Sequence, residues 1–200
     1  MTFAELKLEL SDRGFNYLSD TRSGVFINRA KDRLDNMYRW PYRDTVAAGA
    51  APLTVADLGQ VESVVNTSQG SYPLCEAQHT DLTNWFGDLT ITGTPAYWYR
   101  TNLSATLKVA VYPVSTNNIS VQYWKRTPAL TGVTVPLSPD TYHTLIVDLA
   151  VQMAYRDSDN HASAEALWGE INRQILEMIE DLLPQQQFSY QTTGYGSEDS

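Results

Sequence analysis

The sequence predicts an α+β fold in which N- and C-terminal helices form an antiparallel bundle and an inserted, antiparallel β-rich subdomain separates them. Apolar residues recur at three- and four-residue spacing at both ends of the chain, which is typical of helices packed on one face. The middle of the chain contains short strand patterns and turns instead. We therefore divide the chain into N-terminal helices in residues 1–52, a β-rich insert in 53–136, a C-terminal helix pair in 137–184 and an extended tail in 185–200.

Two N-terminal helices are predicted. Thr2 and Glu5 have the spacing of a capping box, and Gly14 suits the left-handed end of a helix. A second helix is expected from about residue 20 to 39, where Trp40-Pro41 ends it, because proline disfavours helix in the residue before it. Residues 45–52 are small and nearly uncharged, which favours a hinge into the insert.

The insert is predicted to contain a short helix over residues 80–86, stopped by Gly87, and a strand over 97–99. Apolar and polar side chains alternate over residues 107–112 and again over 119–124, which is the period of half-buried strands. Because only a short turn separates these two segments, we expect them to pair as a β-hairpin.

A helix start is predicted at Ser138-Pro139-Asp140, with Ser138 as the cap and proline at the first helical position. A second helix follows a polar break over residues 157–160, and Pro184 closes it. The short break favours an antiparallel helix pair, whose apolar stripes need the N-terminal helices as partners.

Composition excludes several classes of function. The net charge of −9 argues against a nucleic-acid-binding surface, which needs clustered Lys and Arg. Cys75 is the only cysteine, so neither an internal disulfide nor a cysteine zinc cluster is expected. No apolar run approaches the ~20 residues that span a bilayer, and the N-terminus is unlike a signal peptide. We expect synthesis in a cytoplasm, without a membrane step.

No catalytic, cofactor-binding or metal-binding site is predicted. His79, His143 and His161 are far apart in sequence and lack metal-site spacing, so surface or cap-adjacent positions are expected. Ser138, His143 and Asp148 do not suit a hydrolase triad, because Asp148 lies about 140° around the helix from His143. The segment that begins at Asp157 lacks the glycine and terminal glutamate of a calcium loop.

Aromatic residues are the candidates for partner contacts. A possible subunit interface is predicted at Tyr97, Trp98, Tyr112 and Trp124, and the alternative is a carbohydrate- or receptor-binding module that stacks such rings on sugars. The tail has too few apolar residues to pack alone, yet it contains Phe188, Tyr190 and Tyr195. A segment that orders on a neighbouring protein is the favoured interpretation of these three.

Several of these features together resemble the head-to-tail adaptor (connector) proteins of tailed bacteriophages, over about residues 1–185. The resemblance is carried by Arg39-Trp40-Pro41, Gly93-Thr-Pro95-Ala-Tyr97-Trp98-Tyr99, Val109-Ala-Val111-Tyr112-Pro113, Val121-Gln-Tyr123-Trp124-Lys125-Arg126-Thr-Pro128-Ala-Leu130 and Leu137-Ser-Pro139-Asp-Thr-Tyr142-His143. It implies a structural protein of the virion at the head–tail junction, in a ring of twelve copies beneath the portal protein. It also implies that the tail docks on the portal, that a tail or nozzle protein binds the opposite face, and that genomic DNA passes through without specific binding.

Overall fold

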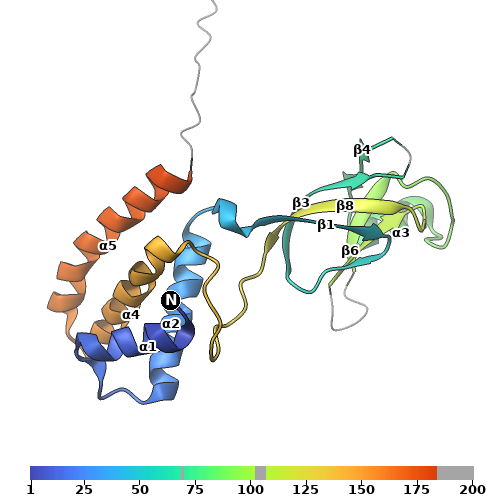
Figure 1. Cartoon of the computed structure of the whole chain (residues 1–200). Helices are drawn as coiled ribbons and strands as arrows, with labels where there is room; N and C mark the ends of the chain where they lie inside the picture. Colours follow the sequence, from blue (N-terminus) through green and yellow to red (C-terminus); the bar gives the residue numbers. More distant parts are fainter. Residues whose placement is uncertain (69, 102–106, 184–200) are drawn as a thin grey trace, which may run out of the picture.

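The computed structural model describes residues 1–68, 70–101 and 107–183, and it has a mixed α+β fold, as predicted. A helical part built from both ends of the chain lies beside an elongated β-rich part (Figure 1). Two connections join them, one near Pro41 and the other over residues 126–138. The tail predicted over residues 185–200 lies outside the described residues.

The N-terminal helices begin at capped positions. The backbone N–H of Glu5 donates to Thr2 Oγ1 at 3.3 Å and that of Thr2 donates to Glu5 Oε2 at 2.7 Å, so the predicted capping box is confirmed. Gly14 has φ +97°, a conformation that glycine adopts without strain. Ser19 caps the second helix by accepting from the N–H of Arg22. The helices are α1 (Phe3–Leu10), continued by a π turn (Ser11–Phe15), and α2 (Asp20–Met37).

The predicted cap at Ser138 is wrong. A 3₁₀ turn (Asp140–Tyr142) precedes α4 (His143–Asp157), so Ser138 lies too far before the helix to cap it, and its buried hydroxyl has no hydrogen-bond partner among the described residues. Helix α5 (His161–Leu182) follows, capped by Asn160. Helix α4 contacts α1, α2 and α5 and is buried along most of its length, because it supplies the centre of one apolar core. The fully buried large side chains of this core include Leu6, Leu10, Ile27, Leu34, Trp40, Leu145, Ile146 and Leu149.

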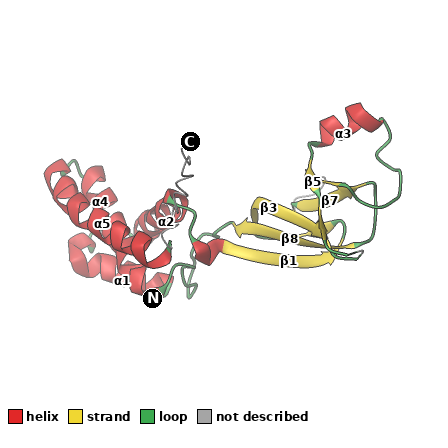
Figure 2. Cartoon of the chain, turned by 90° about the horizontal axis from the view of Figure 1, so that it is seen from above, coloured by secondary structure: helices red, strands yellow, loops and turns green. Residues whose placement is uncertain are grey.

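Two four-stranded sheets face each other in the β-rich part (Figure 2). The first has the strand order β1-β8-β3-β4 and the second β2-β7-β6-β5; all described pairings are antiparallel except β5 with β6. The first sheet contains β1 (Asp44–Ala50), β8 (Asn118–Lys125), β3 (Leu58–Asn66) and β4 (Tyr72–Pro73). The second contains β2 (Leu53–Thr54), β7 (Lys108–Tyr112), β6 (Tyr97–Thr101) and β5 (Cys75–Glu76).

Two predictions about this part are wrong. Residues 45–52 are not a hinge, because Asp44–Ala50 form β1 and pair with β8 along seven residues. The segments 107–112 and 119–124 are strands but not a hairpin, because β7 and β8 belong to different sheets. Their apolar side chains pack face to face across the sandwich, in the core formed by Val109, Val111, Ile119, Val121 and Tyr123 with Trp98, Leu58 and Val64.

The predicted short helix is confirmed as α3 (His79–Phe86), and Gly87 ends it with φ +71°. It lies at the far end of the β-rich part from the helices (Figure 2). Leu82 is fully buried and packs with Tyr112, which anchors this helix to the second sheet.

Candidate interaction surfaces

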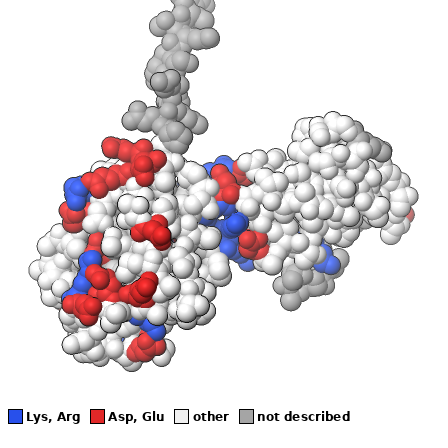
Figure 3. Space-filling model, in the orientation of Figure 1, with Lys and Arg blue, Asp and Glu red and all other residues white. Residues whose placement is uncertain are grey.

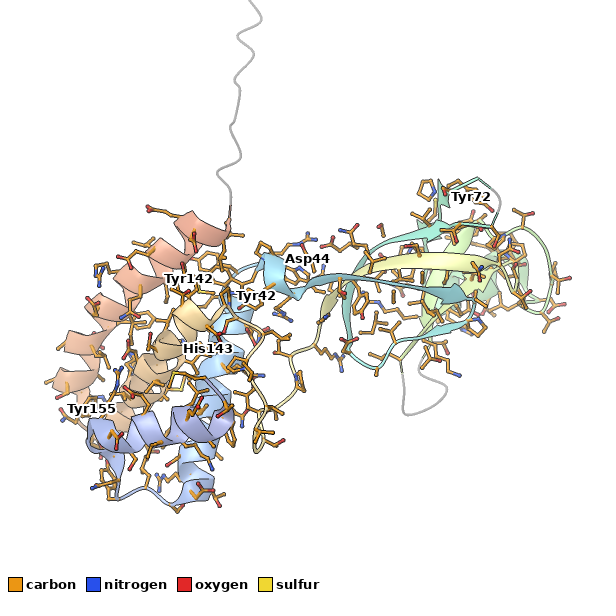
Figure 4. The ribbon with its side chains drawn as sticks, viewed as in Figure 1. Tyr42, Asp44, Tyr72, Tyr142, His143 and Tyr155 are labelled. Carbon is orange, nitrogen blue, oxygen red and sulfur yellow. The ribbon has the colours of Figure 1, made fainter. Side chains whose placement is uncertain are left out.

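The junction between the two parts is built around Trp40, which is fully buried. Its indole N–H donates to the Leu34 carbonyl at 2.7 Å, which satisfies its only donor. Beside it, Tyr42 donates to Asp35 Oδ1 at 2.9 Å (Tyr42 is labelled in Figure 4). Burial, together with the adjacent Asp35 carboxylate, raises the pKa of Tyr42 well above its ordinary value. The end of α2 is thus fixed to the start of the β-rich part by hydrogen bonds inside the protein.

Arg43 ties both parts together. It donates to the Lys125 carbonyl from two nitrogens, at 3.1 and 2.9 Å, and to the Asp35 carbonyl at 2.5 Å. Its guanidinium also lies 5.3 Å from the ring centre of Trp124, and that of Arg39 lies 4.9 Å from the same ring. Trp124 is therefore held at the junction by two cations and is not a free aromatic platform on the sheet.

The return connection is bonded to α2 as well. The buried Lys31 ammonium donates to the carbonyls of Thr127 and Pro128, at 3.2 and 2.8 Å. Asn28 accepts from the N–H of Leu130 at 2.7 Å and donates to its carbonyl at 3.2 Å. Because these bonds satisfy the backbone of an otherwise irregular segment, both connections are fixed to the same helix.

His143 is buried, so a surface position is wrong for this histidine, but it is the first residue of α4 and therefore lies next to the helix cap, the other predicted position. Its Nε2 lies 2.9 Å from the Ser138 carbonyl oxygen and its Nδ1 lies 2.6 Å from the amino group of Met1 (His143 is labelled in Figure 4). Burial, with a contribution from that amino group, lowers the pKa of His143. Asp148 binds Arg13 and Gln174 instead, so the structure does not bring Ser138, His143 and Asp148 together as a triad.

An aromatic cluster, which we call the aromatic tip, forms where α3 packs on β6 and β7. It consists of Trp85, Phe86, Tyr97 and Tyr112, with ring centres 4.8 Å apart for Phe86 and Tyr112 and 6.1 Å apart for Trp85 and Tyr97. The side chain of Trp85 is 60% exposed and that of Phe86 43%, so the cluster continues from the core to the surface. Ile91 and Val114, joined by a hydrogen bond from the Val114 N–H to the Ile91 carbonyl at 2.8 Å, are further exposed apolar residues of the β-rich part.

The burial of the predicted interface residues differs from one to the next. Trp98 is 2% exposed because it lies on the inner face of the second sheet, and Tyr112 is 3% exposed because α3 covers it on the opposite face. Neither side chain can form a subunit contact in this conformation. Tyr97 is half-buried within the aromatic tip, and Trp124 is half-buried at the junction. Only these two remain candidates for subunit contacts. The tail residues Phe188, Tyr190 and Tyr195 lie outside the described residues.

Sequence reasoning missed the most exposed aromatic of the β-rich part, Trp85. The signal was present, since Trp85 and Phe86 are consecutive on a predicted helix and consecutive helical residues point about 100° apart. A two-turn helix on a sheet buries one narrow stripe, so one of the two rings had to face solvent.

Charge is distributed unevenly between the two parts. Residues 127–183 contain nine acidic and two basic residues, whereas residues 44–126 contain six acidic and four basic ones. Figure 3 shows acidic side chains over the helical part and few charged side chains over the β-rich part on the same face. The acids of α5 are Glu165, Glu170, Glu177, Glu180 and Asp181, against the single base Arg173.

A hollow of about 400 Å³ lies between α1, α2 and the return connection, lined by Phe3, Lys7, Val25, Arg29 and Leu130 among others. Lys7 forms one wall, because its ammonium pairs with Asp20 at 2.5 Å and lies over the Phe3 ring.

Within the residues that the structure covers, no group of three His, Cys, Asp or Glu side chains is arranged to hold a metal ion. None of the described helices combines the length and apolar character needed to cross a membrane.

A two-part body whose candidate interaction surfaces lie at separate places suits a protein that makes contacts with several partners. The family model described as the SU10 adaptor protein matches residues 1–194, and the chain therefore belongs to this family of phage head-to-tail adaptor proteins. Membership makes the chain a structural component of a virion that interacts with portal and tail proteins. No curated protein matches the sequence.

Proposed function

We propose that the chain forms a ring of about twelve copies beneath the portal, joins the portal to the tail, and surrounds the channel through which the genome leaves. The single observation that carries this proposal is the match of the adaptor family over residues 1–194, nearly the whole chain. The two-part body supports it, because an adaptor needs separate surfaces for the proteins above and below it.

In this proposal the helices act as an antiparallel bundle that forms the body of the ring. Neighbours in a ring contact each other through two different patches, since the contact repeats by rotation. The acidic excess of residues 127–183 suits a position at the channel, because carboxylates repel passing phosphates and leave DNA mobile.

The tail, residues 185–200, is proposed to dock on the portal through Phe188, Tyr190 and Tyr195. One such segment per copy gives the ring many weak anchors that act together. Deletion of residues 185–200 is expected to abolish co-purification of the adaptor with portal rings, while the deleted chain keeps the thermal unfolding temperature of the full chain. Portal binding at the affinity of the full chain would contradict the docking role.

The opposite contact, with a tail or nozzle protein, is proposed for the aromatic tip. Its half-exposed Trp85 and Phe86 have the residue types and the neutral surroundings of an interface core. Trp85→Ala is expected to leave portal binding intact and to lower the yield of tailed particles at least about tenfold. Thr83→Ala, on the same helix and likewise exposed, is the matched control, expected to leave that yield unchanged.

A carbohydrate-binding or receptor-binding role is the second candidate, favoured by the same exposed Trp85. Glycan binding by the purified chain that Trp85→Ala abolishes would support this role. Trp98→Ala cannot test it, because the Trp98 ring is buried.

A further inference from the structure

Strand β1 is the longest edge strand of the two sheets in the described part of the molecule. It ends the order β1-β8-β3-β4 and has seven residues, whereas the other edge strands, β4, β2 and β5, have two each. Figure 2 shows β1 along the outer border of the sheet. A long edge presents a row of unpaired backbone groups, which proteins normally shorten, cover or charge.

The backbone groups that face outward can be assigned from the strand register. The N–H of Ala51 donates to the Asn117 carbonyl at 3.0 Å, next to the pair Ala50 with Asn118. Hydrogen-bonding residues alternate along an antiparallel ladder, so Thr45, Ala47 and Gly49 bond to β8. The N–H and C=O groups of Val46, Ala48 and Ala50 then point away from the sheet. None of the described residues forms a hydrogen bond with them.

Strand β1 has little of the usual protection of a free edge, since its only charged side chain is Asp44, at its first residue. Residues 45–54 contain no charged side chain, and the register between β1 and β8 runs without a bulge. Val46 is 62% exposed, and Ala48 and Ala50 are exposed as well. Their small side chains leave the backbone open to another strand. In the same molecule, by contrast, the edge strand β4 contains Pro73, which has no N–H to donate.

We propose that the β1 edge binds an extended, uncharged segment of another virion protein, which adds a strand to this sheet. A seven-residue strand is about 23 Å long, so the bound segment needs about seven residues to pair along all of it. A β-branched or aromatic residue placed beside Val46 would cover its exposed side chain. A charged residue in the middle of the segment would lie against the uncharged border and is disfavoured.

A second copy of the chain is a poorer occupant, and this step rests on the proposed ring. The other described edges are too short to pair with seven residues, so only β1 of another copy could match. Two β1 strands pair antiparallel about a two-fold axis, which joins two subunits and cannot link successive subunits of a ring. In the proposed ring, the segment that pairs with the β1 edge therefore comes from a different protein.

Hydrogen exchange of the wild-type chain, free and in intact virions, tests the proposal directly. In the free chain the amides of Val46, Ala48 and Ala50 are expected to exchange rapidly, since they face water. In virions they are expected to exchange at least about tenfold more slowly. Unchanged exchange in virions that contain the chain contradicts the β1 proposal and leaves the adaptor proposal standing, whereas absence of the chain from virions contradicts the adaptor proposal.

A variant pair at one position separates edge pairing from side-chain contact. Ala48→Pro removes an outward N–H but no bond to β8, and Ala48→Val keeps the N–H with a side chain that favours strands. Ala48→Pro is expected to fold, as judged by its circular dichroism spectrum, and to reduce tailed particles at least about tenfold; Ala48→Val should behave as wild type. Normal particle yield with a folded Ala48→Pro chain contradicts the proposal.

A photoreactive residue at position 46 identifies the occupant in assembled particles. Crosslinks to another virion protein support the proposal. Crosslinks to β1 of a second copy, or to residues 184–200 of one, would overturn it by giving the edge a different occupant.

Discussion

At the scale of single residues, two tryptophans of the β-rich part have opposite environments. Trp98 is 2% exposed within the core between the sheets, and Trp85 is 60% exposed at the aromatic tip. Alternation along a strand shows that neighbouring residues face opposite sides, but it does not show which side the second sheet covers. The sequence therefore predicted an aromatic surface, and only the fold shows that Trp98 and Tyr112 are buried and do not belong to it.

Truncation of these two residues is expected to have very different effects on stability. Trp98→Ala should lower the free energy of unfolding by about 3–5 kcal/mol, since it removes a large buried side chain and leaves a cavity. Trp85→Ala should change it by less than about 0.5 kcal/mol, as at other exposed positions. Urea unfolding followed by circular dichroism measures both, and equal losses would contradict the assignment of the two environments.

Burial of His143 makes stability depend on pH. Its pKa is lowered from the ordinary value of 6.5 in the folded chain, so as pH falls the unfolded chain takes up the proton first. The stabilisation is thus complete above pH 6.5 and is lost as pH falls through the lowered pKa. The free energy of unfolding should be lower at pH 5.5 than at pH 7.5.

Substitution separates His143 from other groups that titrate in the same range. His143→Asn removes the titrating ring and should reduce the difference in unfolding free energy between pH 7.5 and 5.5. His161→Asn, at a histidine whose side chain is 71% exposed, should keep the wild-type difference. The same pH dependence in all three proteins would rule out a buried, neutral His143.

At the scale of secondary-structure elements, local patterns predicted which segments form helices and strands better than they predicted their partners. Capping chemistry at Thr2 and the left-handed glycine after α3 act within a few residues, so sequence alone identifies them. The pairing of β1 with β8 joins residues between 68 (Ala50 with Asn118) and 80 (Asp44 with Trp124) positions apart, and nothing local specifies it. The small residues in 45–52 predict a hinge when they are considered alone, because β8, the strand that pairs with them, lies far away in the sequence.

Substitution of Arg43 and of Arg39 tests which contacts stabilise the junction between the helical part and the β-rich part. Arg43 and Arg39 lie over the same Trp124 ring, but Arg43 is buried and bonded to backbone carbonyls, while the Arg39 side chain is 56% exposed and pairs with Glu62. Arg43→Ala should reduce the free energy of unfolding by about 2–3 kcal/mol, because it leaves buried carbonyls unpaired. Arg39→Ala should reduce it by less than about 1 kcal/mol, as for surface ion pairs. Thermal unfolding provides the comparison, and a larger loss for Arg39→Ala would contradict it.

At the scale of the whole molecule, the candidate interaction surfaces lie in different parts, and this separation supports the proposed role as an adaptor. The acidic helices and the neutral aromatic tip lie in different parts, and hydrogen bonds from α2 to both connections hold those parts together. A rigid two-ended body transmits position from one protein to another, which is what a junction protein requires. The order of helical and strand-rich segments predicted a mixed α+β fold, whereas the free β1 edge depends on strand order and could be seen only in the structure.

The most direct test is a cryo-electron microscopy reconstruction of the head–tail junction in intact virions. The account predicts a ring of density directly beneath the portal into which the helical and β-rich parts fit, with the aromatic tip turned toward the tail. A junction at which the portal contacts the tail without this chain between them would contradict it.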